Sequence, residues 1–92
     1  MDKVLQNIGL AYKARKTILG EEVLDRFEEI KLLIIASDIS EKSKERYLKK
    51  CHYYNVNYID NYNSADISKS LGKCNIKIVG LIDEGFVRTI LW

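Results

Sequence analysis

The chain has 92 residues, of which 47% are hydrophobic and 30% are charged, and it contains no proline. A chain of this length forms one domain, here residues 1–92, and this composition excludes disordered, collagen-like and low-complexity classes. The formal net charge of +2 does not by itself indicate a nucleic-acid or an acidic partner. The longest apolar run, Leu32 to Ala36, is far shorter than the ~20 residues of a membrane span, so we expect no membrane partner.

The N-terminal residues and the cysteines indicate the cellular compartment. Asp2 and Lys3 interrupt the first ten residues, which lack the apolar stretch and cleavage site of a secretory signal, so we expect a cytoplasmic protein. Cys51 and Cys74 have no Cys-x-x-Cys spacing, which disfavours a disulfide framework or a structural zinc site. We expect both cysteines to be buried thiols.

Charge is distributed unevenly along the chain. Residues 21–38 hold six acids against Arg26 and Lys31, and a basic stretch lies on each side of them. Such stretches attract phosphate, although a solvated helix face is their more common meaning. The first stretch contains Lys13, Arg15 and Lys16; the second contains Lys42, Lys44, Arg46, Lys49 and Lys50.

Apolar spacing predicts the first half of the fold. Helical periodicity indicates a helix over residues 2–14, and Gly9 within it indicates a close approach by a neighbouring element. Residues 17–19 are β-prone, Gly20 breaks the chain, and a second helix is expected to start at Glu21. The apolar run over residues 32–36 predicts a strand that is covered on both faces and central in its sheet.

Capping residues and short apolar runs predict the second half. Asp38 and Glu41 have the spacing of a capping box and predict the start of a basic third helix. We expect a strand over residues 56–59, a polar loop over 60–64, a fourth helix ending at Gly72, and a strand over 76–82. Asp83 then starts a terminal helix. The residues of that helix expected to pack inward are Phe86, Val87, Ile90 and Leu91.

The alternation of strands and helices predicts a layered α/β/α domain with a partly parallel sheet. The chemistry of a catalytic centre is missing from it. His52 and Cys51 are adjacent on a predicted helix and point about 100° apart, so they do not pair. No phosphate-binding glycine loop and no metal or nucleophile motif occurs. We therefore expect no enzyme, no catalytic residue, no metal and no cofactor.

Asp38 and Asp83 each follow a buried strand, as the acids of phosphoacceptor receiver domains do. A receiver also needs two adjacent acids after its first strand and a lysine after a later one, and this chain lacks both. Helix capping is the better interpretation of the two aspartates.

Six ordered segments together carry a resemblance to a known family: Ile8–Lys16, Gly20–Glu22, Leu32–Asp38, Lys50–Val56, Ser70–Lys73 and Asp83–Phe86. They resemble the ribosomal protein L7Ae, L30e and Gadd-type family, and in particular its bacterial YlxQ-like branch. The resemblance covers nearly the whole chain. It implies an α/β fold that is a three-layer α/β/α sandwich around a four-stranded mixed sheet. It also implies a non-enzymatic protein that binds kink-turn RNA, a sharply bent duplex with sheared G·A pairs, in a ribosome- or translation-related context.

The resemblance implies that RNA meets the start of the second helix and the loop before the fourth. A helix N-terminus has free N–H groups that suit a phosphate, and basic side chains next to it add positive charge. Tyr58 and Tyr62 are available for stacking. The residues expected to bind RNA are Lys13, Arg15, Lys16, Gly20, Glu21, Glu22, Arg26, Asp60, Asn61, Tyr62 and Asn63.

This chain departs from the Gly-x-Asn-Glu-x-x-Lys pattern of RNA-binding members of that family. The asparagine is absent, and the lysine position falls on Arg26 if Gly20 is the anchor or on Asp25 if the apolar spacing is. Carboxylates such as those of Glu21 and Glu22 can still accept hydrogen bonds from guanine N–H groups. The segment between Gly20 and residue 38 is about three residues shorter than in such members, which predicts a truncated second helix.

The acid-rich second helix leaves an alternative open. On the same fold, a protein-interaction module that has lost RNA binding would use this surface to contact ribosomal, transcription or translation proteins.

Overall fold

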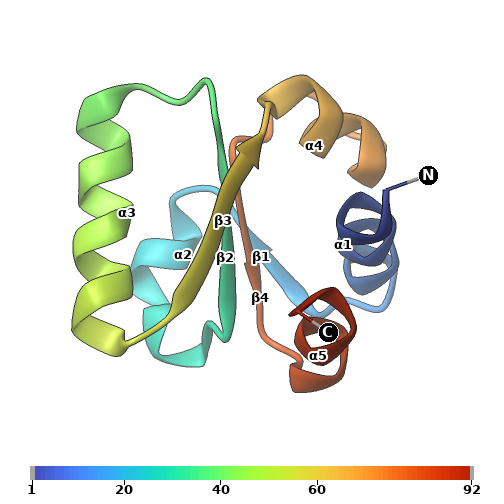
Figure 1. The fold of residues 1–92 in the computed structure, drawn as a ribbon, viewed down its shortest axis with the longest axis horizontal. Helices are drawn as coiled ribbons and strands as arrows, with labels where there is room; N and C mark the ends of the chain where they lie inside the picture. Colours follow the sequence, from blue (N-terminus) through green and yellow to red (C-terminus); the bar gives the residue numbers. More distant parts are fainter. Residues whose placement is uncertain (1, 92) are drawn as a thin grey trace.

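The computed structural model describes residues 2–91 and shows one mixed sheet between two layers of helices (Figure 1). Strand β2 lies between β4, to which it is antiparallel, and β3, to which it is parallel; β1 pairs with the other side of β4. Helices α1, α4 and α5 cover one face, and α2, η1 and α3 cover the other. The elements are α1 (Lys3–Lys13), β1 (Thr17–Leu19), α2 (Glu22–Asp25), the 3-10 helix η1 (Phe27–Glu29), β2 (Leu32–Ala36), α3 (Glu41–Tyr54), β3 (Asn57–Tyr62), α4 (Ser64–Leu71), β4 (Ile78–Leu81) and α5 (Glu84–Leu91).

The three-layer sandwich and the mixed four-stranded sheet confirm the predicted fold. Every residue of β2 and of β4 is buried, because both strands are central and have helices on both faces. Strand β4 is shorter than the predicted 76–82. The reason is that the backbone N–H of Ile76 donates to the Ser68 hydroxyl of α4 at 2.8 Å instead of joining the sheet.

Each face of the sheet has its own apolar core. Under α1, α4 and α5, the helices come close enough that a Cβ added to Gly9 would lie 2.6 Å from the carbonyl oxygen of Ser70 in α4. This confirms the close approach predicted at Gly9. Under α2, η1 and α3, the ring of Phe27 is 1% exposed and stacks on Tyr54 with centroids 5.5 Å apart.

The second helix is truncated, as predicted. Helix α2 has four residues and is followed by the three-residue η1, because Arg26, with φ −124° and ψ 32°, leaves the helical conformation between them. The break keeps Val23, Phe27 and Ile30 buried against the sheet.

Three predictions about loops and termini were wrong. The segment expected as a polar loop continues β3 as far as Tyr62, because Tyr62 pairs with Ala36 of β2 beyond a bulge. Cys51 is buried, whereas Cys74 is exposed in the connection after α4. Leu91 is 48% exposed, since it lies one residue beyond the inward-facing Ile90 and therefore about 100° around α5.

The two aspartates after buried strands have different roles. Asp83 accepts from the N–H of Phe86 at 3.4 Å and caps the start of α5, as expected. Asp38 does not cap α3, whose cap is Ser40. Asp38 instead accepts from the backbone N–H of Ser64 at 2.8 Å and from its hydroxyl at 2.6 Å, so it ties the turn after β2 to the start of α4.

Over residues 2–91, no helix is both long and apolar enough to cross a membrane.

Candidate functional site

Strand directions place the candidate residues at two different ends of the sheet. The carboxyl ends of β1, β2 and β3 and the amino end of β4 lie together, as shown by the Gly20 N–H donating to the Ile78 carbonyl at 3.0 Å. At the same end, Ser37 N–H donates to the Tyr62 carbonyl at 2.7 Å. The opposite end carries Lys16, whose carbonyl accepts from Ile82 at 3.1 Å. We call the end with Gly20 the upper end of the sheet, as it appears in Figure 1.

A hollow of about 260 Å³ lies at the upper end, between the start of α2, helix α3 and the start of β4. We call it the α2–α3 hollow. Gly20 and Glu21, two of the expected site residues, contribute to its wall. The other lining residues are Ile39, Ser40, Ser43, Arg46, Tyr47, Asn75, Lys77 and Ile78.

Gly20 shapes the entrance to this hollow. Its φ of +65° lies in the left-handed region that glycine adopts without strain, and the chain turns there from β1 into α2. Glu21 and Glu22, the next two residues, are exposed. Because α2 has only four residues, few peptide dipoles are aligned in it, so its N-terminus attracts an anion less strongly than a long helix would. Positive charge at the hollow therefore comes from Arg46 and Lys77.

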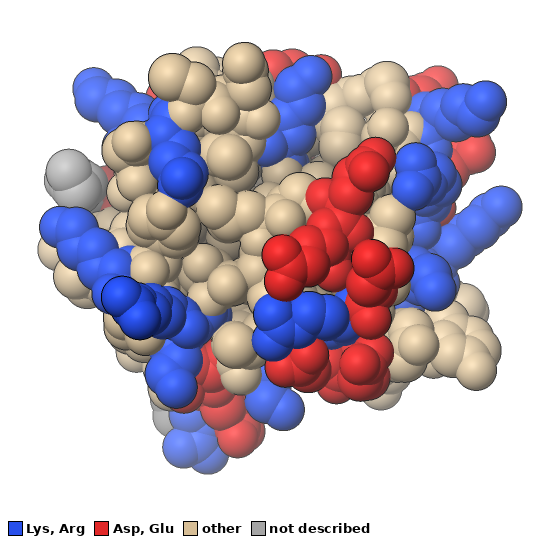
Figure 2. Space-filling view, turned by 180° about the vertical axis from the view of Figure 1, so that it is seen from behind, with Lys and Arg blue, Asp and Glu red and all other residues tan. Residues whose placement is uncertain are grey.

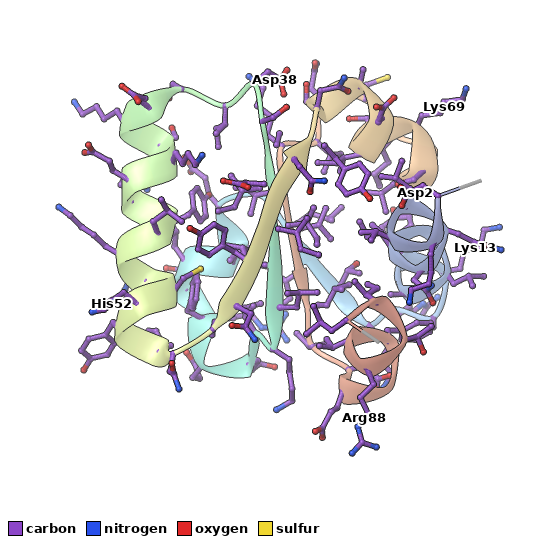
Figure 3. All side chains as sticks on the ribbon, in the orientation of Figure 1. Asp2, Lys13, Asp38, His52, Lys69 and Arg88 are labelled. Carbon is purple, nitrogen blue, oxygen red and sulfur yellow. The ribbon has the colours of Figure 1, made fainter. Side chains whose placement is uncertain are left out.

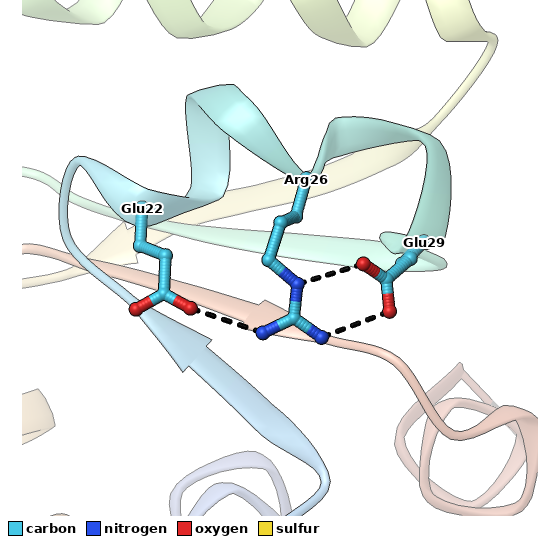
Figure 4. Close-up of polar contacts among 3 residues, drawn as sticks. All are labelled: Glu22, Arg26 and Glu29. Carbon is cyan, nitrogen blue, oxygen red and sulfur yellow. Dashed lines mark hydrogen bonds and ion pairs between the residues drawn. The ribbon is translucent and has the colours of Figure 1, made fainter.

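Arg26 is engaged by two carboxylates (Figure 4). Its guanidinium donates to both oxygens of Glu29, at 2.7 Å from Nε and 2.9 Å from Nη2, and to Glu22 at 3.0 Å from Nη1. The hydrogen bonds and charge of Arg26 lower the pKa of Glu29, and the carboxylates raise the pKa of Arg26. All three side chains are more than a third exposed, so the cluster is a surface network. These bonds use three of the five N–H donors of the guanidinium, and a phosphate that approached Arg26 would also meet the two carboxylates.

Acidic side chains dominate the surface around this cluster. Figure 2 shows them gathered over α2 and η1 around a basic group. Basic side chains on the side of the molecule where α1 lies are separated from this acidic surface in the same view. The acidic residues of these two short elements and the cap before them are Glu21, Glu22, Asp25, Glu28 and Glu29.

The candidate residues at the end of β3 mostly hold the fold together. Asp60 pairs with the Nζ of Lys44 in α3 at 2.9 Å, which raises the pKa of Lys44. The Tyr62 hydroxyl donates to both oxygens of Asp2 at 2.8 Å, and burial together with this bond raises the pKa of Tyr62 to about 12. Asn63 caps α4 by accepting from the N–H of Asp66 at 2.8 Å.

Asn61 is different from its neighbours on β3. It is exposed, and its side chain makes no hydrogen bond within residues 2–91. Strands β4 and β2 separate β3 from β1, so Asn61 and Gly20 share the upper end of the sheet at its two edges, roughly 14 Å apart across three strand spacings.

The structure does not bring the basic exit of α1 to the α2–α3 hollow. Arg15, with φ 60°, and Lys16 form the turn that ends α1, and β1 then carries the chain about 13 Å from Lys16 to Gly20 at the other end. Lys13 lines a separate groove between α1 and α4. The expectation that these basic side chains lie next to the start of the second helix was therefore wrong, because they are close to it along the chain but not in space.

Several residues of the hollow were missing from the sequence-based site. Arg46 was counted only as part of a basic run, although its position directly before the buried Tyr47 places it at the flank of the helix. Asn75, with φ 56°, and Lys77 follow Ser70–Lys73, a segment that carried part of the family resemblance. The resemblance of that segment is the signal that could have identified this loop.

No metal-binding cluster occurs among the described residues, and the buried cysteine is a poor nucleophile. No group of three or more His, Cys, Asp or Glu residues within 2–91 is arranged to hold a metal ion. Burial raises the pKa of the Cys51 thiol to about 11, so little of it is a nucleophilic thiolate near neutral pH.

Two curated proteins are similar in sequence to this chain. "RNA-binding protein YlxQ" of Enterococcus faecium is 37% identical over 89 residues, which are 94% of this chain and 85% of that protein. "RNA-binding protein YlxQ" of Bacillus subtilis strain 168 is 31% identical over 87 residues, 91% of this chain and 87% of that protein. Both carry the name of a binding protein and not of an enzyme, in agreement with the non-enzymatic role expected from the sequence.

Solved structures show the same fold. A protein of unknown function from Bacillus halodurans has a TM-score of 0.91 and 29% identity, covering 99% of this chain and 95% of that one. The Giardia lamblia 15.5kD RNA binding protein has a TM-score of 0.80 at 13% identity, covering 97% of this chain and 79% of that one, and at this identity it supports the fold alone. The model of the ribosomal protein L7Ae/L30e/S12e/Gadd45 family matches residues 2–90, so the chain belongs to that family.

Proposed function

We propose that this protein binds structured RNA of the kink-turn type in the cytoplasm, in a ribosome- or translation-related context, through the α2–α3 hollow. The observation that carries the proposal is the hollow itself. It is lined by Gly20 at positive φ, by the cations Arg46 and Lys77, and by the acceptor Glu21. The two relatives named as RNA-binding proteins, which match more than nine-tenths of this chain, support an RNA as the occupant.

The residues of the hollow divide into two roles in this proposal. Arg46 and Lys77 hold phosphates, which position the RNA without reading its sequence. The carboxylate of Glu21 accepts from the imino and amino groups of a guanine, as expected for an unpaired base edge or a sheared G·A pair. Glu22 is engaged with Arg26, so in the proposal it holds that arginine and does not read a base.

The remaining candidates lie at the margins of this site. Asn61 meets RNA that crosses the upper end of the sheet, whereas Asp60, Tyr62 and Asn63 support its position through their own contacts. The basic exit of α1, residues 13–16, contributes only to an RNA long enough to reach the opposite end of β1.

Two duplexes of equal length and composition, one with a kink-turn and one straight, provide the test. We expect tighter binding of the kink-turn duplex, measured by fluorescence anisotropy. The Arg46→Ala, Lys77→Ala double variant should weaken binding and reduce the slope of log K against log salt by roughly 1.4 to 1.8, for two lost phosphate contacts. Arg15→Ala, Lys16→Ala also removes one arginine and one lysine, so it is the matched comparison, and it should cause a smaller loss. Equal affinity for both duplexes would exclude kink-turn recognition.

A protein-interaction module is the second candidate function, because the exposed surface of α2 and η1 is acidic and its arginine is already paired. Failure to bind either duplex at low salt would favour this function over RNA binding.

A further inference from the structure

The groove between α1 and α4 is distinct from the α2–α3 hollow. It has a volume of about 460 Å³ and is lined by residues of α1 and α4, two of the helices that cover the other face of the sheet. We call it the α1–α4 groove. Its lining includes Leu5, Gly9, Leu10 and Lys13 from α1, and Asp66 and Lys69 from α4.

The lining of the groove is mainly apolar, although Gln6 and Ser70 also contribute to it. Helices α1 and α4 touch at Gly9, which has no side chain to keep them apart. A Cβ added there would lie only 2.6 Å from the carbonyl oxygen of Ser70. Leu5 is half-buried beside it, and Leu10 is 47% exposed. An apolar side chain laid between Leu5 and Leu10 would remove their apolar surface from water, which is favourable.

Basic side chains gather at one end of the groove. The two helices start at the same end, because the Tyr62 hydroxyl just before α4 bonds to Asp2, the cap of α1. Lys13 and Lys69 are in the last turns of their helices, and both project to the same side, away from the sheet (Figure 3). Lys73 follows α4, with its Nζ 5.5 Å from the centre of the Tyr12 ring. The groove therefore has a basic end and, at Asp66 in the first turn of α4, an acidic residue toward the other.

We propose that the α1–α4 groove binds an acidic amphipathic helix of a partner protein. The apolar stripe of that helix lies over Leu5 and Leu10, and its carboxylates lie against Lys13 and Lys69. A helix fits because a third helix can pack into the furrow between two others, with apolar anchors one turn apart. This site goes beyond the proposed RNA function, and since the two sites are on opposite faces of the sheet, both can be occupied at once.

The chemistry of the groove favours a protein over RNA. Nucleic-acid surfaces combine cations with aromatic rings on which bases stack, but no aromatic residue lines this mainly apolar groove, and Lys73 already lies over the ring of Tyr12. A second copy of this chain is also disfavoured. Docking its acidic α2–η1 surface into the groove would be a head-to-tail contact, which forms an open filament unless the rotation closes a ring.

Photo-crosslinking in cells tests the proposal at one residue. The photoreactive amino acid p-benzoylphenylalanine replaces Leu10, and in a control chain it replaces Leu91, which is exposed to the same extent at 48% but lies on α5. Mass spectrometry then identifies the crosslinked segment. We expect the Leu10 probe, and not the Leu91 probe, to capture a segment of another protein that combines acidic with apolar residues at helical spacing. Lys13→Glu, Lys69→Glu should abolish that crosslink.

A synthetic peptide that copies the captured segment measures the interaction directly. We expect Lys13→Glu, Lys69→Glu to lower the affinity for the peptide about tenfold, because two exposed ion pairs are replaced by two repulsive pairs. The control Lys31→Glu, Lys49→Glu changes the net charge equally at exposed positions. It should change the affinity by no more than about twofold. A kink-turn duplex should not displace the peptide. The proposal is overturned by capture of RNA or of a second copy at Leu10, by a captured segment without acids, by no crosslink above the Leu91 control, or by equal effects of the two double variants.

Discussion

Helices α1 and α4 close over one face of the sheet, whereas α2 and α3 leave a hollow on the other. On the first face, Gly9 lets the backbones meet, and the result is a mainly apolar groove with lysines at its rim. On the second face, the break at Arg26 shortens α2 to one turn, and polar and charged side chains line the space beside it. The contrast shows that a small residue and an interrupted helix, placed on opposite sides of one sheet, produce two surfaces with different chemistry.

The comparison also separates two kinds of charge. Lys13 and Lys69 border a mainly apolar surface, where their charge selects a partner and the apolar lining holds it. Arg46 and Lys77 border a polar hollow that contains a carboxylate. The net charge of +2 conceals both arrangements, because the acids over α2 and η1 offset the lysines elsewhere.

The largest effect should come from the core beneath the α2–η1 face. Phe27→Ala removes a fully buried ring that stacks on Tyr54, and we expect it to lower the free energy of unfolding by about 3–5 kcal/mol. Urea denaturation followed by circular dichroism measures the change. Ile67→Ala, in the core under α1 and α4, is the matched variant and should cost about 2–5 kcal/mol. A loss below about 1 kcal/mol for Phe27→Ala would show that the face with short helices is not packed as described.

The next effect is smaller and tests the close contact of α1 and α4. We expect alanine to destabilise the protein at one helix glycine and not at another. Gly9→Ala places a methyl group 2.6 Å from the Ser70 carbonyl, and overpacking of about 1–3 kcal/mol should outweigh the ~1 kcal/mol gained in helix propensity. Gly85→Ala in α5 meets only a side-chain oxygen of Asp83 at 3.1 Å and should be neutral or stabilising. Thermal unfolding of both variants gives the comparison. Equal stabilisation by the two alanines would mean that the helices do not touch at Gly9.

A third prediction concerns the acidic surface and RNA. Glu29→Gln removes the carboxylate that holds two nitrogens of Arg26, and the freed guanidinium should raise affinity for a kink-turn duplex about two- to fivefold. Glu28→Gln removes the same charge from an exposed neighbour without a side-chain hydrogen bond in residues 2–91. A similar gain from both variants would attribute the effect to overall charge and not to Arg26.

The smallest effect is a difference in acid stability. The Tyr62 hydroxyl and the N–H groups of Leu5 and Val4 lower the pKa of Asp2 below its usual value of 3.8. A lowered folded-state pKa means that the contribution of Asp2 to stability is complete above the unfolded-state value and is lost as the pH falls through the folded-state value. Asp2→Asn should therefore flatten the dependence of the unfolding temperature on pH below about pH 4.

The control for this measurement is Asp25→Asn, which changes an exposed aspartate that makes no side-chain hydrogen bond in residues 2–91. It should leave the pH dependence unchanged. Parallel curves for Asp2→Asn and the native protein would argue against the bond between Asp2 and Tyr62 that joins the starts of α1 and α4.

Much of the fold was predictable because its signals are local. The apolar run of β2 indicates a strand covered on both faces wherever its neighbours lie, and the spacing of apolar residues identifies the buried side of each long helix. Gly9 correctly indicated a close approach by another element, and Gly20 correctly indicated a break in the chain, where the structure has a positive φ. Segment order and residue type were sufficient for the family.

The composition of the candidate site depended on tertiary structure. Strand β4, the last in the sequence, inserts between β1 and β2, and this brings Lys77 and Asn75 to Gly20 from more than fifty residues away. The antiparallel pairing of β1 with β4 leaves Lys16 and Gly20 at opposite ends of the sheet although only three residues separate them in the chain. Asp38, placed as a cap by its local spacing, bonds to Ser64 because the parallel pairing of β2 and β3 brings that residue beside it. Periodicity records which side of an element is buried, and it contains no information on strand order, which depends on contacts between distant segments.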